Sequence, residues 1–375
     1  MDCFKNILQL QKMKEFHRNI IFTRTPMKGC YRFKDEFQLY PADFQNSPKS
    51  QHAKHFPIVL EFWTDDSENQ IIPPSSTFYE FREFLKTSTN TNMQNKLNRI
   101  INLLTALSNH RFFQYANFEG HWTFVLPNGE ITEELNSQFS QWGIQWFNYP
   151  GMNKEFKIEN FITLHNETIK PKPHTSYYLH EPLEKYNGEI FFPDSLDFAL
   201  ETYFEFNEKK RKIVDSVAHL ICNGIDMTQK MKSMSFLSFV SSIETLVNHE
   251  NTEKNKEIKF ECHECQTINS SPYSCNKCGR PIWGIAFKFR EFLKTFVSTS
   301  ENSIKKYKRI YNLRSKIVHD GALLLGDNQI DWENQEKSKE QTLVYLETMQ
   351  LSRLALMRWL IMKNSNFEIS PSVFS

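Results

Sequence analysis

Residues 302–321 of this 375-residue chain read NSIKKYKRIYNLRSKIVHDG, and this stretch is the most informative feature of the second half of the chain. We expect it to form a helix over residues 302–319. Gly321 follows at the position where helices commonly end in a left-handed residue. The same stretch carries Arg314 and His319, which can bind a phosphate and move a proton, respectively.

Four other segments with apolar residues at helical spacing surround this helix in the sequence. They are residues 194–221, residues 233–247, a segment with Phe289, Phe292, Leu293 and Phe296, and residues 339–362. The last segment is apolar on most faces, which predicts the central core helix. Five helices with short connections are typical of a helical bundle.

The first half of the chain has a mixed pattern. Short alternating or apolar runs predict strands at residues 31–40, 58–63, 122–126, 143–149, 158–164 and 190–192. Helical spacing predicts a helix within residues 95–113. We therefore expect an α+β module over residues 1–192, followed by an all-α bundle over residues 193–375 with a small insert at about 259–283.

Composition excludes several classes of protein. The net charge of +1 gives no overall attraction to nucleic acid, so any basic site must be local. The chain has 11 glycines and contains neither GxGxxG nor GxxxxGK[ST], the signatures of nucleotide-binding loops. We expect no signal peptide and no membrane span. Seven cysteines, four of them in two CxxC pairs, favour a reducing compartment such as the cytoplasm.

The two CxxC pairs predict a metal site. They are separated by nine residues, and each can supply two thiolates to one tetrahedral ion. A closed shell of four thiolates leaves no position for water, so we expect a structural Zn²⁺ in a zinc-ribbon or knuckle insert. The alternatives are unrelated reduced cysteines, a redox dithiol, or His263 in place of one thiolate. The expected ligands are Cys262, Cys265, Cys275 and Cys278.

The spacing of Arg314 and His319 can also be explained without a functional site. Any charged helix yields this spacing by chance, and a histidine in a last helical turn is often a simple cap. The functional interpretation is supported by Ser315, which shares a helical face with His319, and by Asp320, which can orient the imidazole. The same helix also carries a basic strip that can follow a nucleic-acid backbone, formed by Lys305, Lys306, Lys308, Arg309 and Lys316.

The order of these features resembles the HEPN superfamily, and is most similar to its Apea-like branch. The resemblance covers roughly residues 194–365 and rests on SIETL at residues 242–246, the cysteine-rich insert and YNLRSKIVHDG at residues 311–321. The family pattern is Arg, a polar residue and then His after four to six residues, and Arg314, Ser315 and His319 match it. Many members have asparagine where this chain has Ser315.

The resemblance implies a homodimer in which two such motifs face each other across a cleft. It also implies metal-independent cleavage of RNA, often in antiphage defence by abortive infection or as a toxin. His319 would act as general base or acid, Arg314 would stabilise the phosphorane, and Glu244 would be an auxiliary residue or pair with a lysine.

Other functions remain open at this point. One alternative is a non-catalytic HEPN module that binds a nucleotide, RNA or protein. Another is a zinc-ribbon nucleic-acid adaptor that uses Lys277 and Arg280. For residues 1–192 we expect a sensor or regulatory role, with a phage-derived molecule or the product of a neighbouring gene as regulator.

Overall fold

The computed structural model divides the chain into two compact units. The first comprises residues 1–104, 110–171 and 183–192, and the second comprises residues 105–109, 172–182 and 193–375. The structure describes residues 14–42, 56–65, 78–114, 160–164, 167–179, 188–254, 260–262, 265–269, 274–279, 284–325, 327 and 335–364. No helix in these ranges is long and apolar enough to cross a membrane.

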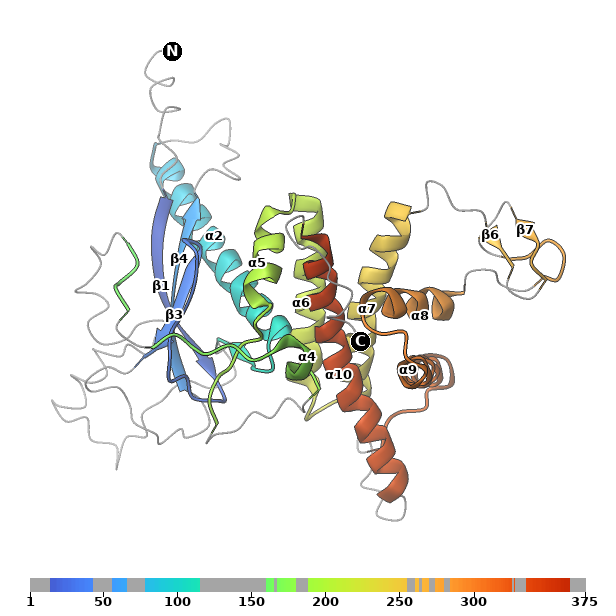
Figure 1. Cartoon of the computed structure of the whole chain (residues 1–375). Coiled ribbons are helices and arrows are strands. Elements are labelled where there is room, and N and C mark those ends of the chain that lie inside the picture. Colours follow the sequence, from blue (N-terminus) through green and yellow to red (C-terminus); the bar gives the residue numbers. More distant parts are fainter. Residues whose placement is uncertain are drawn as a thin grey trace, which may run out of the picture. The chain divides into compact units, whose positions relative to one another are not determined.

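The first unit contains an antiparallel sheet of five strands in the order β2-β3-β4-β1-β5 (Figure 1). The strands are β1 (Lys14–Thr23), β2 (Tyr31–Phe33), β3 (Phe37–Pro41), β4 (Phe56–Asp65) and β5 (Phe112–Phe113). The long helix α2 (Phe78–Leu107) runs beside the sheet, and Lys96 on it pairs with Glu36 in the β2–β3 turn, with Nζ and Oε2 2.9 Å apart. The unit is therefore of mixed α and β structure, as predicted.

Several predictions within this unit need correction. Residues 31–40 form two strands, because the chain turns at residues 34–36 and Lys34 adopts a left-handed conformation with φ of 45°. The helix begins well before residue 95, and β1 has no counterpart among the predicted strands. Residues 160–164 and 190–192 form no strand. The strands predicted at 122–126 and 143–149 lie outside the described residues.

One polar row crosses the sheet. Glu61 on β4 is fully buried and accepts hydrogen bonds from Arg18 Nε on β1 at 2.6 Å and from Tyr40 Oη on β3 at 2.9 Å. The amide of Gln38 donates to its second oxygen at 2.5 Å. Buried carboxylates require such partners, and here they come from both neighbouring strands. This row fixes the register of the three strands.

The second unit is helical. It contains α4 (His174–Tyr177), α5 (Leu196–Glu205), α6 (Glu208–Met227), α7 (Lys232–Lys254), α8 (Ile285–Phe296), α9 (Glu301–Asp320) and α10 (Gln335–Lys363). The single helix predicted over residues 194–221 is instead two helices. Phe206 is extended, and the side chain of Asn207 accepts from the Lys210 N–H at 3.0 Å, so that Asn207 caps α6.

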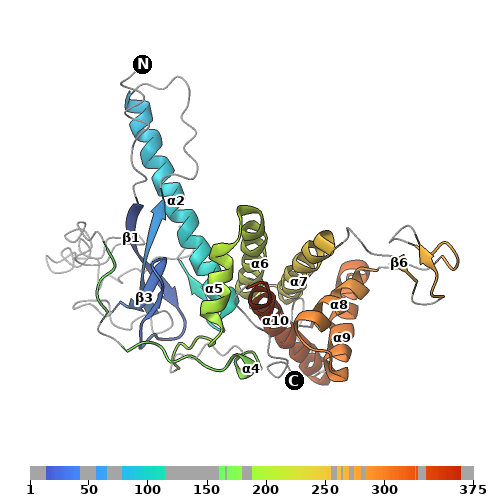
Figure 2. The ribbon, with the colours of Figure 1, turned by 45° about the horizontal axis from the view of Figure 1, so that its top comes forward.

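The last helix is the centre of this unit, as predicted. Helix α10 contacts α5, α6, α7, α8 and α9 (Figures 1 and 2). Trp359 and Leu356 on it are fully buried, and the Trp359 indole donates to Glu250 of α7 at 2.7 Å. A helix buried on most faces needs neighbours all round, which explains why the other five present apolar stripes to it.

The end of α9 is fixed to the start of α7. Gly321 adopts the left-handed conformation, with φ of 64°, as predicted. Beyond it, the Leu324 N–H donates to Ser233 Oγ at 2.8 Å. The carboxylate of Asp327 accepts from the Lys232 and Ser233 N–H groups at 2.5 and 2.8 Å, and so caps α7. These bonds hold the last turn of α9, which carries His319, near the first turn of α7.

A buried histidine joins α4 to the helices. Ser195 Oγ lies 2.9 Å from His174 Nδ1, and Arg358 of α10 donates to His174 Nε2 at 3.3 Å. Nε2 of the ring therefore accepts a hydrogen bond, which requires that this nitrogen carries no proton. Burial, and next the charge of Arg358, lower the pKa of His174 from 6.5 to about 4, with Asp194 acting in the opposite direction.

This site predicts a pH dependence of stability. Because the unfolded chain binds the His174 proton at higher pH than the folded chain, the stabilisation is complete above pH 6.5 and is lost as the pH falls towards 4. The loss is about 3 kcal/mol in all. We expect the free energy of unfolding, measured in urea, to fall between pH 7.5 and pH 5.0. The fall should be about 2 kcal/mol larger for the wild type than for His174→Gln. Equal losses in the two proteins would contradict this account; His219→Gln, at an exposed histidine of α6, is the control.

Candidate functional site

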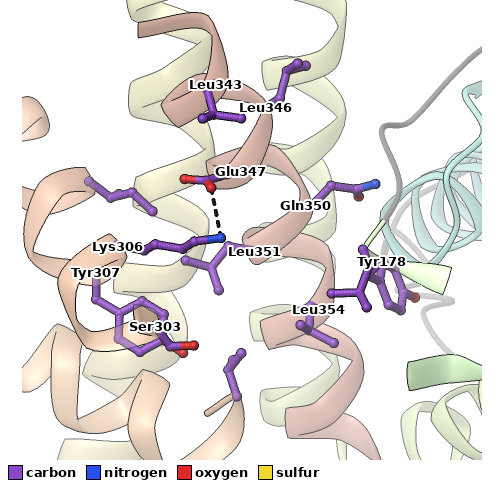
Figure 3. Close-up of a pocket in the computed structure, with 13 residues that line it drawn as sticks. Tyr178, Ser303, Lys306, Tyr307, Leu343, Leu346, Glu347, Gln350, Leu351 and Leu354 are labelled. Carbon is purple, nitrogen blue, oxygen red and sulfur yellow. Dashed lines mark ion pairs between the residues drawn. The ribbon is translucent and has the colours of Figure 1, made fainter. Parts of the chain in front are cut away.

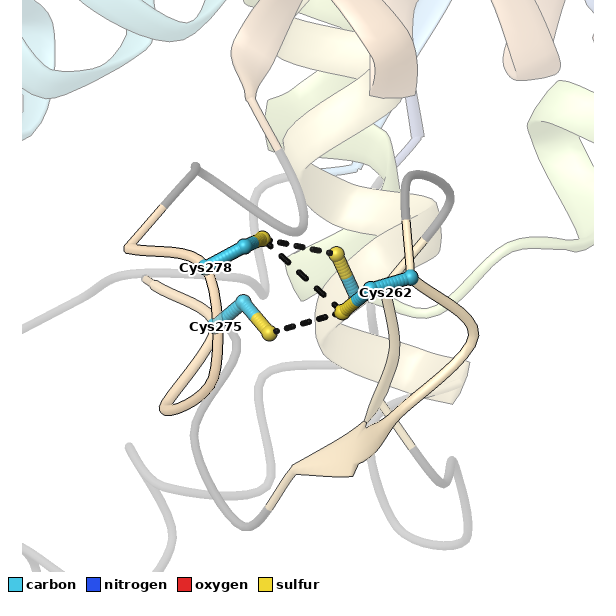
Figure 4. Close-up of side chains that lie close together, drawn as sticks. Cys262, Cys275 and Cys278 are labelled. Atoms are coloured by element: carbon cyan, nitrogen blue, oxygen red, sulfur yellow. Dashed lines mark hydrogen bonds between the residues drawn. The ribbon is translucent and has the colours of Figure 1, made fainter.

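The four predicted metal ligands form one cluster. Their sulfur atoms all lie within 4.8 Å of one another (Figure 4). The distance is 3.6 Å between the sulfurs of Cys262 and Cys278, 3.4 Å between those of Cys265 and Cys275, and 3.8 Å between those of Cys265 and Cys278. Four thiolates at about 2.3 Å from a tetrahedral ion would be about 3.8 Å apart, so the cluster has the size that a metal ion requires. His263, the alternative ligand, lies outside the described residues.

The two CxxC turns have the same backbone geometry. The Gln266 N–H donates to Cys262 O at 2.7 Å, and the Gly279 N–H donates to Cys275 O at 2.8 Å. Gln266 and Gly279 are both left-handed, with φ of 55° and 70°. This repetition forms a pair of matched knuckles, each of which directs two sulfurs to the same point.

Backbone N–H groups favour the thiolate form of these cysteines. The N–H groups of Cys278 and Lys277 lower the pKa of Cys275 to about 6, against the effect of desolvation. Hydrogen bonds from the Thr267 side chain and backbone lower the pKa of Cys265. Since the thiolate is the metal ligand, the knuckles are prepared to bind a cation.

Asn269 joins the two knuckles, and its role was missed in the sequence. It lies on β7 (Ile268–Asn269), which pairs with β6 (Phe260–Glu261). Its buried amide donates to Thr267 O at 2.7 Å and to Cys275 Sγ at 3.7 Å, and its Oδ1 accepts from the Asn276 N–H at 2.8 Å. An asparagine four residues after a CxxC pair carries no sequence signal of this role.

The second group of predicted residues lies where α7 meets α9. Arg314 faces Glu244 of α7, with Nε 3.4 Å from Oε1 and Nη2 3.5 Å from Oε2. Both side chains are largely buried, with 23% and 15% of their surface exposed, so this pair is screened less than a surface ion pair. Glu244 therefore pairs with an arginine. The two alternatives expected from the sequence were an auxiliary role in the site and an ion pair with a lysine.

Tyr311 completes this cluster. The Arg314 guanidinium lies over its ring, 5.7 Å from the centroid, and the ring packs against Phe289 of α8. Burial, and next the negative charge of Glu244, raise the pKa of Tyr311. The sequence contained one signal for this contact, since Tyr311 and Arg314 are three residues apart on one helix.

The structure does not place Arg314 and His319 on the same face of α9. Five residues advance about 140° around the helix beyond a full turn. Arg314 therefore points towards α7, whereas His319 is exposed in the last turn beside exposed Asp320. Half-buried Ser315 and exposed Val318 occupy the arc between them. Arg314 and His319, the two residues predicted to be functional, thus lie at opposite edges of this arc.

A separate pocket lies between α9 and α10 (Figure 3). It has a volume of about 290 Å³, and most of its wall is apolar, with leucines of α10 on one side. Its charged lining residues, Lys306 and Glu347, form an ion pair with Nζ and Oε1 2.9 Å apart. The pocket contains none of the residues of the Arg314 cluster.

Comparisons with protein-family models, with curated proteins and with solved structures found no match for this chain. Its function therefore has to be inferred from its own residues.

The cysteine cluster predicts tightly bound metal. We expect the purified protein to contain about one equivalent of metal by mass spectrometry, and Cys275→Ser to lose it because three ligands no longer close the shell. Cys222→Ala removes a buried cysteine of α6 instead and should retain the metal. Unchanged metal content in Cys275→Ser would refute the site.

Asn269 predicts a weaker effect on the same site. Asn269→Ala removes the bonds that hold the two knuckles together, and residues that support ligands typically contribute 10–100-fold to metal affinity. Competition with a chromogenic chelator should show a loss of this size. Asn276→Ala keeps the backbone N–H that Asn269 binds and should leave the affinity unchanged.

Proposed function

We propose that this protein is a metal-independent endoribonuclease of the HEPN type, with Zn²⁺ as a structural ion in its insert. The observation that supports it most is the Arg314–Glu244–Tyr311 cluster beside an exposed histidine at the end of the same helix. If this side of α9 were an ordinary charged surface, the side chain of Arg314 would be exposed to solvent. Here Arg314 is largely buried and its direction is held by two neighbours.

The position of Glu244 leaves Arg314 able to bind a second anion. Its Nε and Nη2 face the carboxylate, and its Nη1 makes no hydrogen bond with the residues that the structure describes, so these donors can meet a phosphate oxygen. An oriented guanidinium stabilises the charge that develops on phosphorus without having to reorganise. We assign Glu244 the role of positioning Arg314.

The chemistry follows from the residues present. The 2′-hydroxyl of a ribose attacks the adjacent phosphorus, and the 5′-oxygen leaves, so that the products end in a 2′,3′-cyclic phosphate and a 5′-hydroxyl. One base must take the proton of the 2′-hydroxyl and one acid must protonate the 5′-oxygen. The imidazole of His319 can take up a proton or give one away, but it cannot do both at the same instant.

We therefore propose a homodimer through the bundle, in which each chain contributes one His319 and one Arg314. In a dimer one imidazole is the base and the other is the acid. Ser315 lies on the arc of α9 between Arg314 and His319 and would contact the substrate. The setting we propose is the cytoplasm, in antiphage defence or as a toxin, with the sheet-containing unit as sensor or regulator.

The zinc assignment rests on the donor set. Four thiolates without an oxygen or open position suit Zn²⁺, which prefers a closed tetrahedral sulfur shell in structural sites. Among the described residues of the insert, those that are buried are Cys262, Cys275 and Asn269. A segment with so little apolar burial depends on its metal to fold.

The test of the nuclease is RNA cleavage by the zinc-loaded protein with and without EDTA. We expect cleavage in both conditions, a loss of 10²–10⁴-fold in His319→Ala and of similar order in Arg314→Ala. Glu244→Gln should retain more activity than Arg314→Ala because it keeps one acceptor for the guanidinium. His219→Ala, at an exposed histidine of α6, is the matched control.

Equal cleavage by the wild type, Arg314→Ala and His319→Ala would remove the assignment, as would products that lack the 2′,3′-cyclic phosphate. Intact RNA with tight binding of RNA, nucleotide or protein would instead establish the non-catalytic module.

A further inference from the structure

The exposed face of α9 carries a row of polar and basic side chains that ends at His319. Its members are all exposed and follow one another at intervals of three or four residues. They are Lys305, Lys308, Asn312, Lys316 and His319, and we call them the α9 row. At 100° per residue they lie within an arc of about 80°. No acidic residue occurs on α9 between Lys305 and His319.

Other basic residues of the same helix are neutralised. Lys306 and Arg309 turn towards α10 and share the carboxylate of Glu347, at 2.9 and 2.7 Å. Figure 3 shows the ion pair of Lys306 with Glu347. By contrast, Lys305, Lys308 and Lys316 make no ion pair with any residue in the part of the chain that the structure describes. The expected basic strip is thus divided into a paired half and an unpaired half, and only the unpaired half leads to His319.

The dimensions suit a nucleic-acid strand. From Lys305 to His319 the row spans about 21 Å, at 1.5 Å per residue, which is enough for several nucleotides. A single row on one convex helix can follow one backbone, whereas a duplex presents two. The cleavage reaction also favours a single strand, because the attacking hydroxyl and the leaving oxygen must be able to align.

We propose that the α9 row binds single-stranded RNA, with Lys305, Lys308 and Lys316 on backbone phosphates, and guides the scissile linkage to His319. Asn312 hydrogen-bonds the sugar–phosphate backbone between the lysines. This inference rests on the proposed ribonuclease function. It assigns the three lysines and Asn312 of the row to substrate binding and leaves the chemical step to Arg314 and His319.

Binding can be measured apart from cleavage in the full-length His319→Ala background. Fluorescence anisotropy with a labelled 12-nucleotide RNA should show binding at least tenfold weaker when Lys305→Glu and Lys308→Glu are added. The dependence of log affinity on log salt concentration should flatten by about 1.4, since each phosphate contact on a single strand contributes about 0.7. The matched control is Lys209→Glu with Lys230→Glu, which reverses two exposed charges on α6 and the turn after it.

Each outcome separates the two proposals. Equal affinity and salt dependence for the row variant and the control would overturn the row, whatever the cleavage assay shows. Tighter binding of an RNA duplex than of the single strand would also overturn it. Loss of binding in the row variant, with no cleavage by the wild type, would support the row and overturn the nuclease. In the active protein, Lys305→Gln with Lys308→Gln should raise KM and leave kcat within about twofold.

Discussion

Burial of α10 is the constraint on which the helical unit depends. A helix that contacts five others has no face left for solvent over much of its length, so each neighbour must give its own apolar stripe to the centre. Polar groups inside this core need partners, and the Trp359 indole finds one in Glu250, which Lys363 also approaches at 2.6 Å. The cysteine insert lies in the chain between α7 and α8, where it interrupts neither helix.

This constraint determines what remains for function on α9. Tyr307, Ile310 and Ile317 are buried. The opposite arc is left to solvent, and it carries the α9 row. Arg314 lies on the same side of the helix as these buried residues, and its charged side chain can be largely buried there because Glu244 of α7 supplies a carboxylate. The orientation of α9 about its axis therefore directs Arg314 towards α7 and the α9 row towards solvent.

The sequence predicted best those features that local chemistry decides. Helix α9 and its end at Gly321 were predicted, because a left-handed glycine and apolar spacing act within a few residues. The cysteine cluster was predicted because ligand spacing encodes it. The division at Asn207 was missed, since the apolar stripe continues across the break and only the cap reveals it. The Glu244–Arg314 contact and the bonds of Asn269 depend on tertiary packing, and no spacing in one segment encodes them.

The helical rotation also bears on why the proposed site needs two chains. Within one chain Arg314 is turned towards α7 and His319 towards solvent, about 140° apart around the helix axis. The guanidinium that Glu244 holds and the imidazole of His319 thus point in different directions within one chain. Two copies that meet at the end of α9 would place one chain's His319 opposite the other's, and the exposed Val318 beside it gives such a contact an apolar centre. Since one imidazole cannot supply both acid and base at once, the proposed reaction needs a second imidazole, which the proposed second chain would supply.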